Sequence, residues 1–202
     1  MARTARITEE RILEAAREVF LAEGFGAQTA KIAQRAGVSE GSIFKRFATK
    51  EALFYAALEI DEHPAWYDEI AQRVGQGDSR ENLIQLSLSI ILYTNTILAR
   101  MITKMGSHPT PATFKGLPEH PVVRDRDKVK SYLQQEMDQG RLRRCNPELL
   151  AGMLFGALNH HIFTAMITGH TLNETELANI ASGVVEIFWS GIAPAHGVET
   201  PR

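Results

Sequence analysis

The chain has 202 residues, of which 44% are hydrophobic, and a formal net charge of −2. This length suits one large or two small domains with a sizeable core, and the single cysteine, Cys145, excludes an intrachain disulfide and fits a reducing cytoplasm. The charge is uneven, because residues 1–51 carry nine Lys or Arg against seven Asp or Glu while the remainder is acidic. A mildly basic head on an acidic body is compatible with DNA binding but does not establish it.

The N-terminal segment predicts a short arm followed by a helix. Residues 1–7 carry Arg3 and Arg6 and are interpreted either as a solvated tail or as an arm that reaches DNA. No apolar stretch follows, so we expect no signal peptide. Thr8 is the predicted N-cap of the helix, and Gly24 its predicted end. The apolar stripe of this helix consists of Ile12, Leu13, Ala16, Val19 and Phe20.

Residues 28–47 have the pattern of two short helices joined by a tight turn. Gly37 stands where the first helix must stop, and Ser39 is a predicted N-cap for the second. Ile43 and Phe47 are expected to face inward, which leaves Ser42, Lys45 and Arg46 outward. This is the layout of a helix-turn-helix, whose second helix enters the DNA major groove with its N-terminal residues first.

The run IAQRAGVSEGSIFKRFATKEALF, residues 32–54, resembles the N-terminal domain of the TetR family of bacterial transcriptional regulators (TetR/AcrR type). The resemblance covers about the first sixty residues. It implies an all-α fold, with a three-helix DNA-binding domain in residues 1–54 and a helical ligand-binding and dimerisation bundle in residues 55–202. The matching positions are Ile32, Ala33, Ala36, Gly37, Val38, Ser39, Gly41, Ile43, Phe47, Thr49, Lys50, Glu51 and Leu53.

Three positions depart from the family pattern. Phe44 replaces the usual Tyr and lacks its phosphate-binding hydroxyl, and Arg46 replaces His and could make that contact instead. Ala27 stands where Thr often caps the first helix of the motif, so Thr29 is the nearest substitute. Lys50, at a helix start behind Thr49, is expected to clamp a phosphate, although an exposed lysine without a partner is the alternative. The predicted DNA-binding residues are Thr29, Lys31, Ser39, Gly41, Ser42, Phe44, Lys45, Arg46 and Lys50.

The rest of the chain predicts a helical bundle. Helices are expected from Thr49 to a kink or end at Pro64, over residues 79–104 and 122–139, from Asn146–Pro147 to Thr168, and over 173–192. The helix over 79–104 is apolar almost all round, so we expect it in the middle of the bundle. Arg141, Arg143 and Arg144 are interpreted as surface charge that compensates a helix dipole, and a second nucleic-acid patch is the alternative.

The last two helices carry small and apolar faces wider than one neighbour requires. By resemblance they pair with their mates in a homodimer, and an ordinary intrachain core is the alternative. The longest apolar run, residues 149–167, is broken by Asn159, His160 and His161, so we interpret it as a buried helix and expect no membrane partner. The adjacent His160 and His161 point in different directions and cannot chelate one ion together, so no metal or cofactor is expected.

The leading hypothesis is a cytoplasmic, homodimeric repressor that binds a palindromic operator and is released by a small apolar effector. The alternatives are a ligand-independent DNA-binding protein and a small-molecule-converting all-α enzyme that uses His160 or His161. No set of convergent polar residues supports an enzyme, so none is expected and no catalytic residue is assigned. The predicted effector-binding residues are Trp66, Tyr67, Tyr93, Met101, Met105, Phe114, Tyr132, Met137, Phe155 and Asn159.

Overall fold

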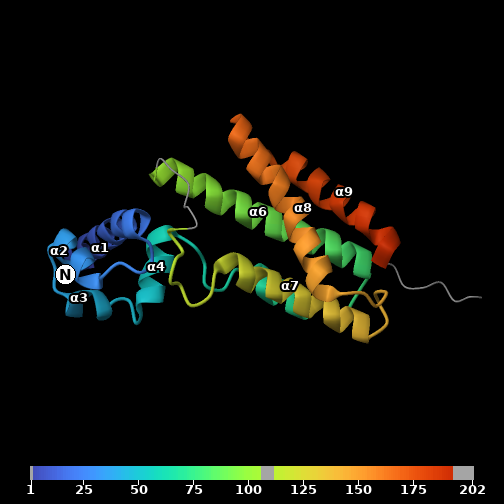
Figure 1. Cartoon of the computed structure of the whole chain (residues 1–202), viewed down its shortest axis with the longest axis horizontal. Helices are drawn as coiled ribbons and strands as arrows, with labels where there is room; N and C mark the ends of the chain where they lie inside the picture. Colours follow the sequence, from blue (N-terminus) through green and yellow to red (C-terminus); the bar gives the residue numbers. More distant parts are fainter. Residues whose placement is uncertain (1, 106–111, 193–202) are drawn as a thin grey trace, which may run out of the picture. The chain divides into compact units, whose positions relative to one another are not determined.

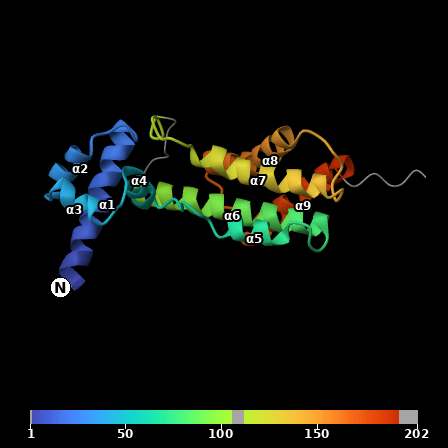
Figure 2. The same cartoon turned by 90° about the horizontal axis from the view of Figure 1, so that it is seen from below.

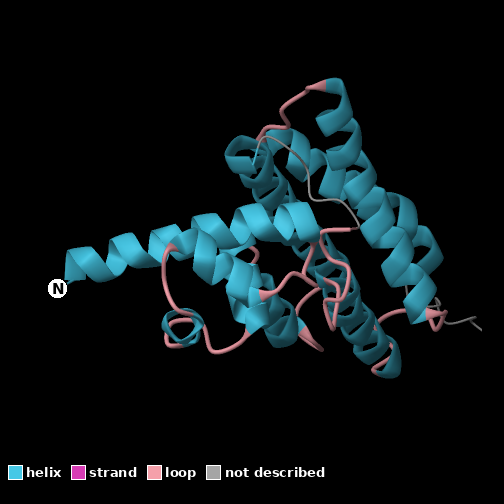
Figure 3. Cartoon of the chain, turned by 60° about the vertical axis from the view of Figure 1, so that its left-hand side comes forward, coloured by secondary structure: helices cyan, strands magenta, loops and turns pink. Residues whose placement is uncertain are grey.

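The computed structural model of the protein describes residues 2–105 and 112–192, with side chains from Thr8 to Arg100 and from Ala112 to Ile192. The described residues form helices and loops without any strand, which confirms the predicted all-α class (Figure 3). The helices are α1 Ala2–Glu23, α2 Thr29–Ala36, α3 Glu40–Phe44, α4 Lys50–Leu58, α5 Trp66–Arg73, α6 Ser79–Met105, α7 Pro121–Asp138, α8 Pro147–Thr168 and α9 Glu174–Ile192.

The described residues divide into two compact units. The N-terminal unit takes the chain up to His63 together with residues from the range 97–120, and the C-terminal unit takes the ranges 64–96 and 121–192. Helix α6 therefore contributes residues to both units. The expected domain boundary between residues 54 and 55 falls inside α4.

The first helix begins earlier than the sequence indicated. α1 starts at Ala2, so the predicted non-helical arm and the Thr8 cap are wrong. No Gly or Pro lies between Ala2 and Thr8, so nothing in this segment breaks a helix, and a threonine can occupy a helix interior at modest cost. The side chains of Arg3 and Arg6 lie outside the described residues. The end of α1 was predicted correctly, since Gly24 follows Glu23 with a left-handed φ of 76°.

The core of the N-terminal unit is built around packed phenylalanines. The Phe54 ring lies edge-on to Phe20 at 5.0 Å and to Phe25 at 5.4 Å between centroids. Phe20 and Phe54 are fully buried. α1 packs against α2 and α4, and Ile12, Ile32 and Ile43 close the same core. The three helices are therefore held by one apolar cluster.

A main-chain contact joins the turn after α1 to the segment after α6. The Phe25 amide donates to the Thr113 carbonyl at 3.0 Å. Gly24 allows this approach, because a Cβ at that position would lie 2.4 Å from the Ala112 carbonyl oxygen. Close backbone approach and positive φ both require glycine there.

The fourth helix ends sooner than predicted. α4 stops at Leu58, and Glu59 adopts the left-handed conformation with φ 56°. The Arg17 side chain on α1 secures this end by donating to the Ala57 carbonyl at 2.9 Å and to Glu59 at 3.4 Å. The predicted continuation to Pro64 is wrong because a tertiary contact, and not the proline, sets the end of the helix.

The C-terminal unit consists of α5, the first part of α6, α7, α8 and α9. Helix α7 packs against α5 and α8, and α8 packs against α9 (Figure 1 and Figure 2). Leu83, Leu86, Ile90 and Ile91 form the buried face of α6. The other large apolar side chains of its described part, up to Arg100, are half-buried, so over that part the expected burial all round the helix is found on one face alone.

Local capping signals fix several helix starts. Asn146 caps α8 by accepting from the Leu149 amide at 3.0 Å, with Pro147 in the first turn as predicted. At α9, Asn173 accepts from the Glu176 amide at 3.0 Å while Glu176 accepts from the Asn173 amide at 2.9 Å. This reciprocal pair is a capping box, and it lowers the pKa of Glu176, chiefly through the Asn173 amide and then through His170.

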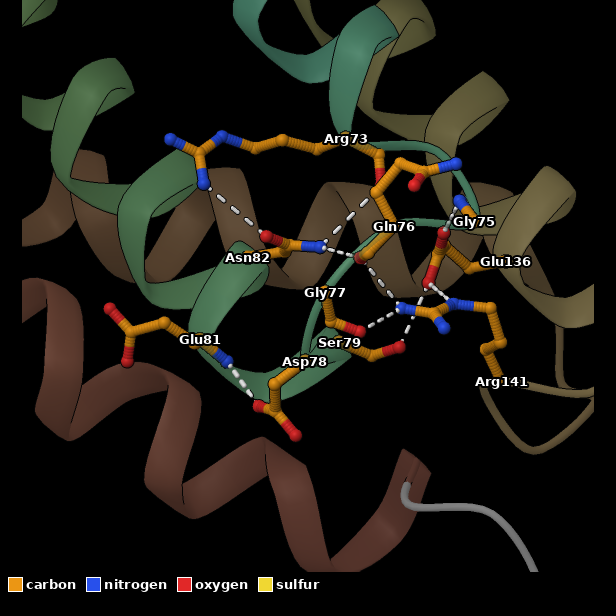
Figure 4. Close-up of polar contacts among 10 residues, drawn as sticks. All are labelled: Arg73, Gly75, Gln76, Gly77, Asp78, Ser79, Glu81, Asn82, Glu136 and Arg141. Atoms are coloured by element: carbon orange, nitrogen blue, oxygen red, sulfur yellow. Dashed lines mark hydrogen bonds and ion pairs between the residues drawn. The ribbon is translucent and has the colours of Figure 1, made fainter.

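A buried glutamate fastens the loop between α5 and α6 onto α7 (Figure 4). Glu136 is fully buried and accepts from the Gly75 amide at 2.7 Å, the Ser79 hydroxyl at 2.9 Å and Arg141 at 2.9 Å. Arg141 also donates to the carbonyls of Gln76 and Gly77, both at 2.8 Å. Arg141 is thus a structural ion-pair partner, and its interpretation as dipole-compensating surface charge is wrong.

Candidate nucleic-acid interface and effector region

Helices α2 and α3 form the predicted helix-turn-helix. Gly37 ends α2 with φ 68°, and its neighbour Val38 packs against the N-terminal core. Ser39 caps α3 by accepting from the Ser42 amide at 3.2 Å. Ile43 is fully buried and Phe47 is 9% exposed, which anchors α3 from its inner side. The turn, the cap and the inward residues follow the prediction.

The outer side of α3 is small and polar at its N-terminal end. Ser39 and Gly41 are exposed and Ser42 is half-buried. The Ser39 and Ser42 hydroxyls lie 2.9 Å apart, so each hydroxyl is held in place by the other. A Cβ at Gly41 would meet nothing nearer than the Ser39 hydroxyl at 3.9 Å, which leaves open space beside the helix. Such a surface can approach the edges of base pairs closely.

Two cations follow directly after this end. Lys45 and Arg46 are both exposed, and Arg46 donates to the Ser42 carbonyl at 3.0 Å. That bond holds the guanidinium along the helix rather than free in solvent. Phe44 is exposed as well. The outward positions of Phe44, Lys45 and Arg46 agree with their predicted roles, which stay predictions.

The cations and hydroxyls of α2 are occupied by acidic partners. Lys31 pairs with Glu23 of α1 at 2.7 Å, and Thr29 donates its hydroxyl to Glu40 of α3 at 2.5 Å. The expectation that Thr29 caps α2 is wrong, because it is the first residue of that helix and Gln28 is the N-cap, without a side-chain hydrogen bond. Instead, Thr29 ties the start of α2 to the start of α3. Lys31 and its partner Glu23 are both exposed, so DNA phosphates can compete for the lysine.

Lys50 stands at the beginning of α4, as predicted. Thr49 caps this helix by accepting from the Ala52 amide at 3.0 Å. The Lys50 ammonium lies 4.7 Å from the centroid of the Phe25 ring. A cation held over an aromatic face beside a helix N-terminus is well placed to meet a phosphate. Sequence reasoning predicted the lysine but not the ring that positions it.

The predicted effector residues of the C-terminal unit fall into a buried and a half-buried group. Trp66, Tyr67, Tyr132, Met137 and Phe155 are buried. Tyr93 and Asn159 are half-buried, and the Asn159 amide donates to the Phe155 carbonyl at 2.8 Å within α8. Met101 and Met105 fall in the range 97–120 that groups with the N-terminal unit, and their side chains lie outside the described residues.

Phe114 belongs to the other unit. Its ring lies 5.8 Å from Phe54 and 4.5 Å from His120, so it packs against the N-terminal core. Its described contacts are thus with residues of the N-terminal unit, whereas Trp66, Tyr67, Tyr93, Tyr132, Met137, Phe155 and Asn159 belong to the C-terminal unit. The sequence could not show this, because the boundary between the two units falls inside α6, and residues 97–105 of that helix group with the N-terminal unit.

A polar cluster that the sequence did not indicate surrounds Tyr67. Tyr67 donates to Asp125 at 2.5 Å, and Arg124 donates to the Tyr67 hydroxyl at 2.8 Å. Lys128 lies 5.2 Å from the centroid of the same ring. Burial, followed by the bond to Asp125, raises the pKa of Tyr67 far above its ordinary value. Tyr67 is consequently a protonated donor at neutral pH, and its hydroxyl is already engaged.

Three neutral buried donors in this unit have no hydrogen-bond partner among the described residues. They are the indole Nε1 of Trp66, the hydroxyl of Ser87 and the hydroxyl of Tyr132. These residues are 3%, 0% and 2% exposed and come from α5, α6 and α7. Buried polar groups are normally satisfied, so each of these requires a water or ligand acceptor, or carries a free-energy cost.

The remaining described features of this unit are a small cavity and two adjacent histidines. A small apolar cavity of about 10 Å³, enough for roughly one water, is lined by Leu83, Leu133, Leu150, Leu154, Val185, Phe188 and Ile192. Within the described residues no three His, Cys, Asp or Glu side chains form a group that could hold a metal ion. His160 and His161 are exposed, with ring centroids 5.7 Å apart.

Family models match both parts of the chain. Residues 12–57 match the N-terminal model of the bacterial regulatory proteins of the tetR family, and residues 98–191 match the C-terminal domain of AefR-like transcriptional repressors. The first match contains the helix-turn-helix described above. The second contains α7, α8 and most of α9.

Two curated relatives match parts of the chain. The uncharacterized HTH-type transcriptional regulator YvkB of Bacillus subtilis is 33% identical over 87 residues, which are 43% of this chain and 44% of YvkB. The uncharacterized HTH-type transcriptional regulator TtgW of Pseudomonas putida is 38% identical over 65 residues, or 32% of this chain and 48% of TtgW. The chain thus spans about half the length of the curated relatives it matches.

Solved structures share the fold over nearly the whole chain. NalD, the secondary repressor of the MexAB-OprM multidrug efflux pump in Pseudomonas aeruginosa, is 20% identical with a TM-score of 0.58, covering 95% of this chain and 99% of NalD. The flavonoid-responsive regulator FrrA is 16% identical with a TM-score of 0.52, covering 94% and 98%. At these identities the likeness concerns the fold alone. The two family models and the geometry of α2 and α3 together show that this chain belongs to the TetR family of bacterial transcriptional regulators.

Proposed function

We propose that the protein is a homodimeric repressor that binds a palindromic operator through α3 and is released by a small, largely apolar effector. The observation that carries the DNA-binding part is the outward side of α3. Small residues there can approach base edges, and Lys45, Arg46 and Lys50 follow where phosphates would run. Two such helices related by a twofold axis would read half-sites about one helical turn, roughly 34 Å, apart or a modest variation on that spacing.

The apolar surface of α8 and α9 supports the homodimer. Leu149, Met153, Phe163 and Ile167 follow one another on α8 at intervals that return to the same face of a helix, and they are 48–65% exposed. Ile187 on α9 is 78% exposed. An exposed apolar face of this kind usually marks a protein–protein interface. A twofold contact is self-complementary, so one patch on each copy is sufficient.

The same face explains why α8 resembles a membrane segment. Two described helical stretches, Ser79–Arg100 and Pro147–Thr168, are long and apolar enough to cross a membrane by length and composition alone. The core helix of a bundle satisfies the same criteria, so the match is weak evidence for a span. Burial of α8 against a second copy accounts for its composition in a regulator that acts in the cytoplasm.

The unpartnered donors in the C-terminal unit support an effector site. Trp66, Ser87 and Tyr132 present N–H or O–H groups inside the core of this unit, without a hydrogen-bond partner among the described residues. An apolar molecule with a carbonyl or ether oxygen would satisfy such a donor and would bury its carbon skeleton as well. An effector of this kind induces release if it binds the DNA-incompetent state more tightly than the competent one.

A DNA-binding titration tests the proposal directly. Fluorescence anisotropy of labelled duplexes would be measured against purified protein at several salt concentrations, with the upstream intergenic DNA and a random duplex of equal length. We expect binding to a site in the upstream DNA that is at least about a hundredfold tighter than to the random duplex, at two protomers per site. Equal affinity for both duplexes, repeated on sequences selected from a random pool, would refute operator recognition.

A ligand test separates the effector from the operator. If the proposal is right, an apolar carbonyl compound added to the protein–operator complex should release the protein from the operator. Unchanged operator affinity across a broad set of such compounds, together with the absence of any bound molecule by mass spectrometry of the denatured protein, would favour the ligand-independent alternative. Sedimentation of the same sample gives the oligomeric state.

A further inference from the structure

An exposed phenylalanine stands on the helix that is expected to enter the major groove. Phe44, the last residue of α3, is 43% exposed. All other exposed large hydrophobic side chains among the described residues lie between Val122 and Ile187, in the C-terminal unit. Phe44 is therefore an exception in the N-terminal unit, where the phenylalanines at positions 20, 25, 47 and 54 are buried.

Local geometry directs Phe44 outward. Ile43 is fully buried against the core, and the next residue on a helix is turned by about 100° from it. Gly41, three residues earlier and on the adjoining surface, has no side chain, and a Cβ there would have open space around it. No side chain projects from the helix at position 41 beside the Phe44 ring, so the edge of a base can reach the ring.

The chemistry of the groove restricts what this ring can contact. A phenyl ring has no donor or acceptor, so it cannot bind a phosphate or the polar edge of a base. The one apolar group that base pairs present in the major groove is the C5-methyl of thymine. The neighbouring Lys45 and Arg46 are exposed and can hold the flanking phosphates.

We propose that Phe44 reads the C5-methyl group of one thymine in each operator half-site and thereby helps to determine which sequence the protein prefers. This inference rests on the proposed entry of α3 into the major groove. It gives Phe44 a role in sequence specificity, although the residue lacks the phosphate-binding hydroxyl of the usual tyrosine.

Replacing thymine by deoxyuridine tests the proposal, because the substitution removes the methyl group and nothing else. Operators would first be selected by the wild-type protein from a pool of random duplexes. Each half-site thymine would then be exchanged for deoxyuridine, one position at a time, and affinities measured by anisotropy. We expect one position in each half-site at which the exchange weakens wild-type binding about fourfold, the effect of burying one methyl group less.

Substitutions of Phe44 complete the experiment. Phe44→Ala should bind the thymine operator more weakly and should no longer distinguish it from the deoxyuridine operator, whereas Phe44→Leu should keep part of the difference. Lys45→Ala is the matched control, which should weaken binding to both duplexes and retain their ratio. Circular dichroism of each variant establishes that the helices are formed.

The outcomes separate this inference from the proposed function. A selected operator without any thymine that responds to the exchange, or a Phe44→Ala variant that keeps the fourfold ratio, would overturn the role of Phe44 and leave operator recognition intact. Failure of the wild type to enrich any sequence from the pool would overturn both.

Discussion

The two units of the molecule differ in how completely their own residues provide hydrogen-bond partners for buried polar atoms and cover large apolar side chains. The four buried side-chain polar atoms without a hydrogen-bond partner, taken over the described residues, belong to Trp66, Ser87, Arg126 and Tyr132 of the C-terminal unit. That unit also carries most of the exposed large hydrophobic side chains, whereas the N-terminal unit has Phe44. The N-terminal unit has the features of a self-contained folding unit, and the C-terminal unit those of a structure completed by other molecules.

The difference reflects what each unit must bind. A surface that contacts DNA through charges and hydrogen bonds can remain in water until DNA arrives, because its polar groups are hydrated. A surface that contacts a second copy or an apolar effector must be apolar, and so it carries a free-energy cost while it is exposed. Mutations should therefore act differently in the two units.

Truncation of the N-terminal core should have the largest effect on stability. Phe54→Ala removes a fully buried ring that touches Phe20, Phe25 and Phe114. We expect the free energy of unfolding to fall by about 3–5 kcal/mol, measured by urea denaturation. Phe44→Ala, at an exposed position, is the control and should change it by less than about 0.5 kcal/mol. Similar losses in the two variants would contradict the self-contained core.

Loss of the buried Glu136 carboxylate should have the second-largest effect on the free energy of unfolding. Glu136→Ala removes the acceptor of Gly75, Ser79 and Arg141 and leaves these donors without it. We expect a loss of about 3 kcal/mol in the free energy of unfolding, with a smaller loss for Glu136→Gln, which keeps an oxygen acceptor. Glu148→Ala, whose exposed carboxylate pairs with Arg126 and Lys130, is the comparison and should cost under about 1 kcal/mol.

A charge on the apolar face of α8 should affect assembly and leave the fold intact. Phe163 is 55% exposed, so Phe163→Glu should leave the helical circular dichroism unchanged. If this face is the dimer interface, we expect the dimer dissociation constant to rise about a hundredfold, or roughly 3 kcal/mol, by analytical ultracentrifugation. Gln135→Glu, at an exposed position on α7 outside this face, provides the control and should leave the dimer unchanged. An unchanged dissociation constant would show that the dimer interface does not include this face of α8.

Removal of a DNA-facing cation should have a moderate effect that depends on salt. Lys50→Ala should weaken binding to operator and random DNA alike, by about 1 kcal/mol at low salt, and should reduce the salt slope by about 0.9, the value for one phosphate. Anisotropy titrations at four salt concentrations would measure both quantities. A loss confined to the operator would instead place Lys50 at a base.

The smallest expected change in stability comes from removing one of the buried donors without a hydrogen-bond partner among the described residues. Ser87→Ala removes a fully buried hydroxyl for which the described residues offer no partner, so the free protein should become more stable by up to about 1 kcal/mol. Thermal denaturation without ligand measures this gain. Ser79→Ala, which deletes a hydroxyl bonded to Glu136, should have the opposite sign. Destabilisation by both substitutions would indicate that an ordered water already satisfies Ser87.

Sequence reasoning predicted the features that depend on near neighbours. Gly37, Ser39, Thr49 and Asn146 act on residues within one helical turn, so each was identified from its local context. On α7 the buried residues Val129, Tyr132, Leu133 and Met137 recur at intervals of three and four, which is a pattern that the sequence shows directly.

Features that join distant positions were missed. Glu136 meets Gly75 and Ser79 from 57 or more positions away, so nothing in its local pattern marked it as a buried anchor. The end of α4 depends on Arg17, 40 residues from the carbonyl that it contacts. The proposed roles of the DNA- and effector-facing residues depend on molecules that the sequence does not contain, and they stay predictions.

The bond from the Phe25 amide to the Thr113 carbonyl has a consequence for how this family member could evolve and be engineered. Both groups belong to the main chain, so almost any side chain at either position preserves the connection between the turn before α2 and the segment after α6. Random substitution of side chains would therefore seldom remove this bond. Gly24 is the exception, because any added Cβ would collide with the Ala112 carbonyl. The bond is thus sensitive to any substitution at Gly24 and to proline at position 25, which would remove the donor.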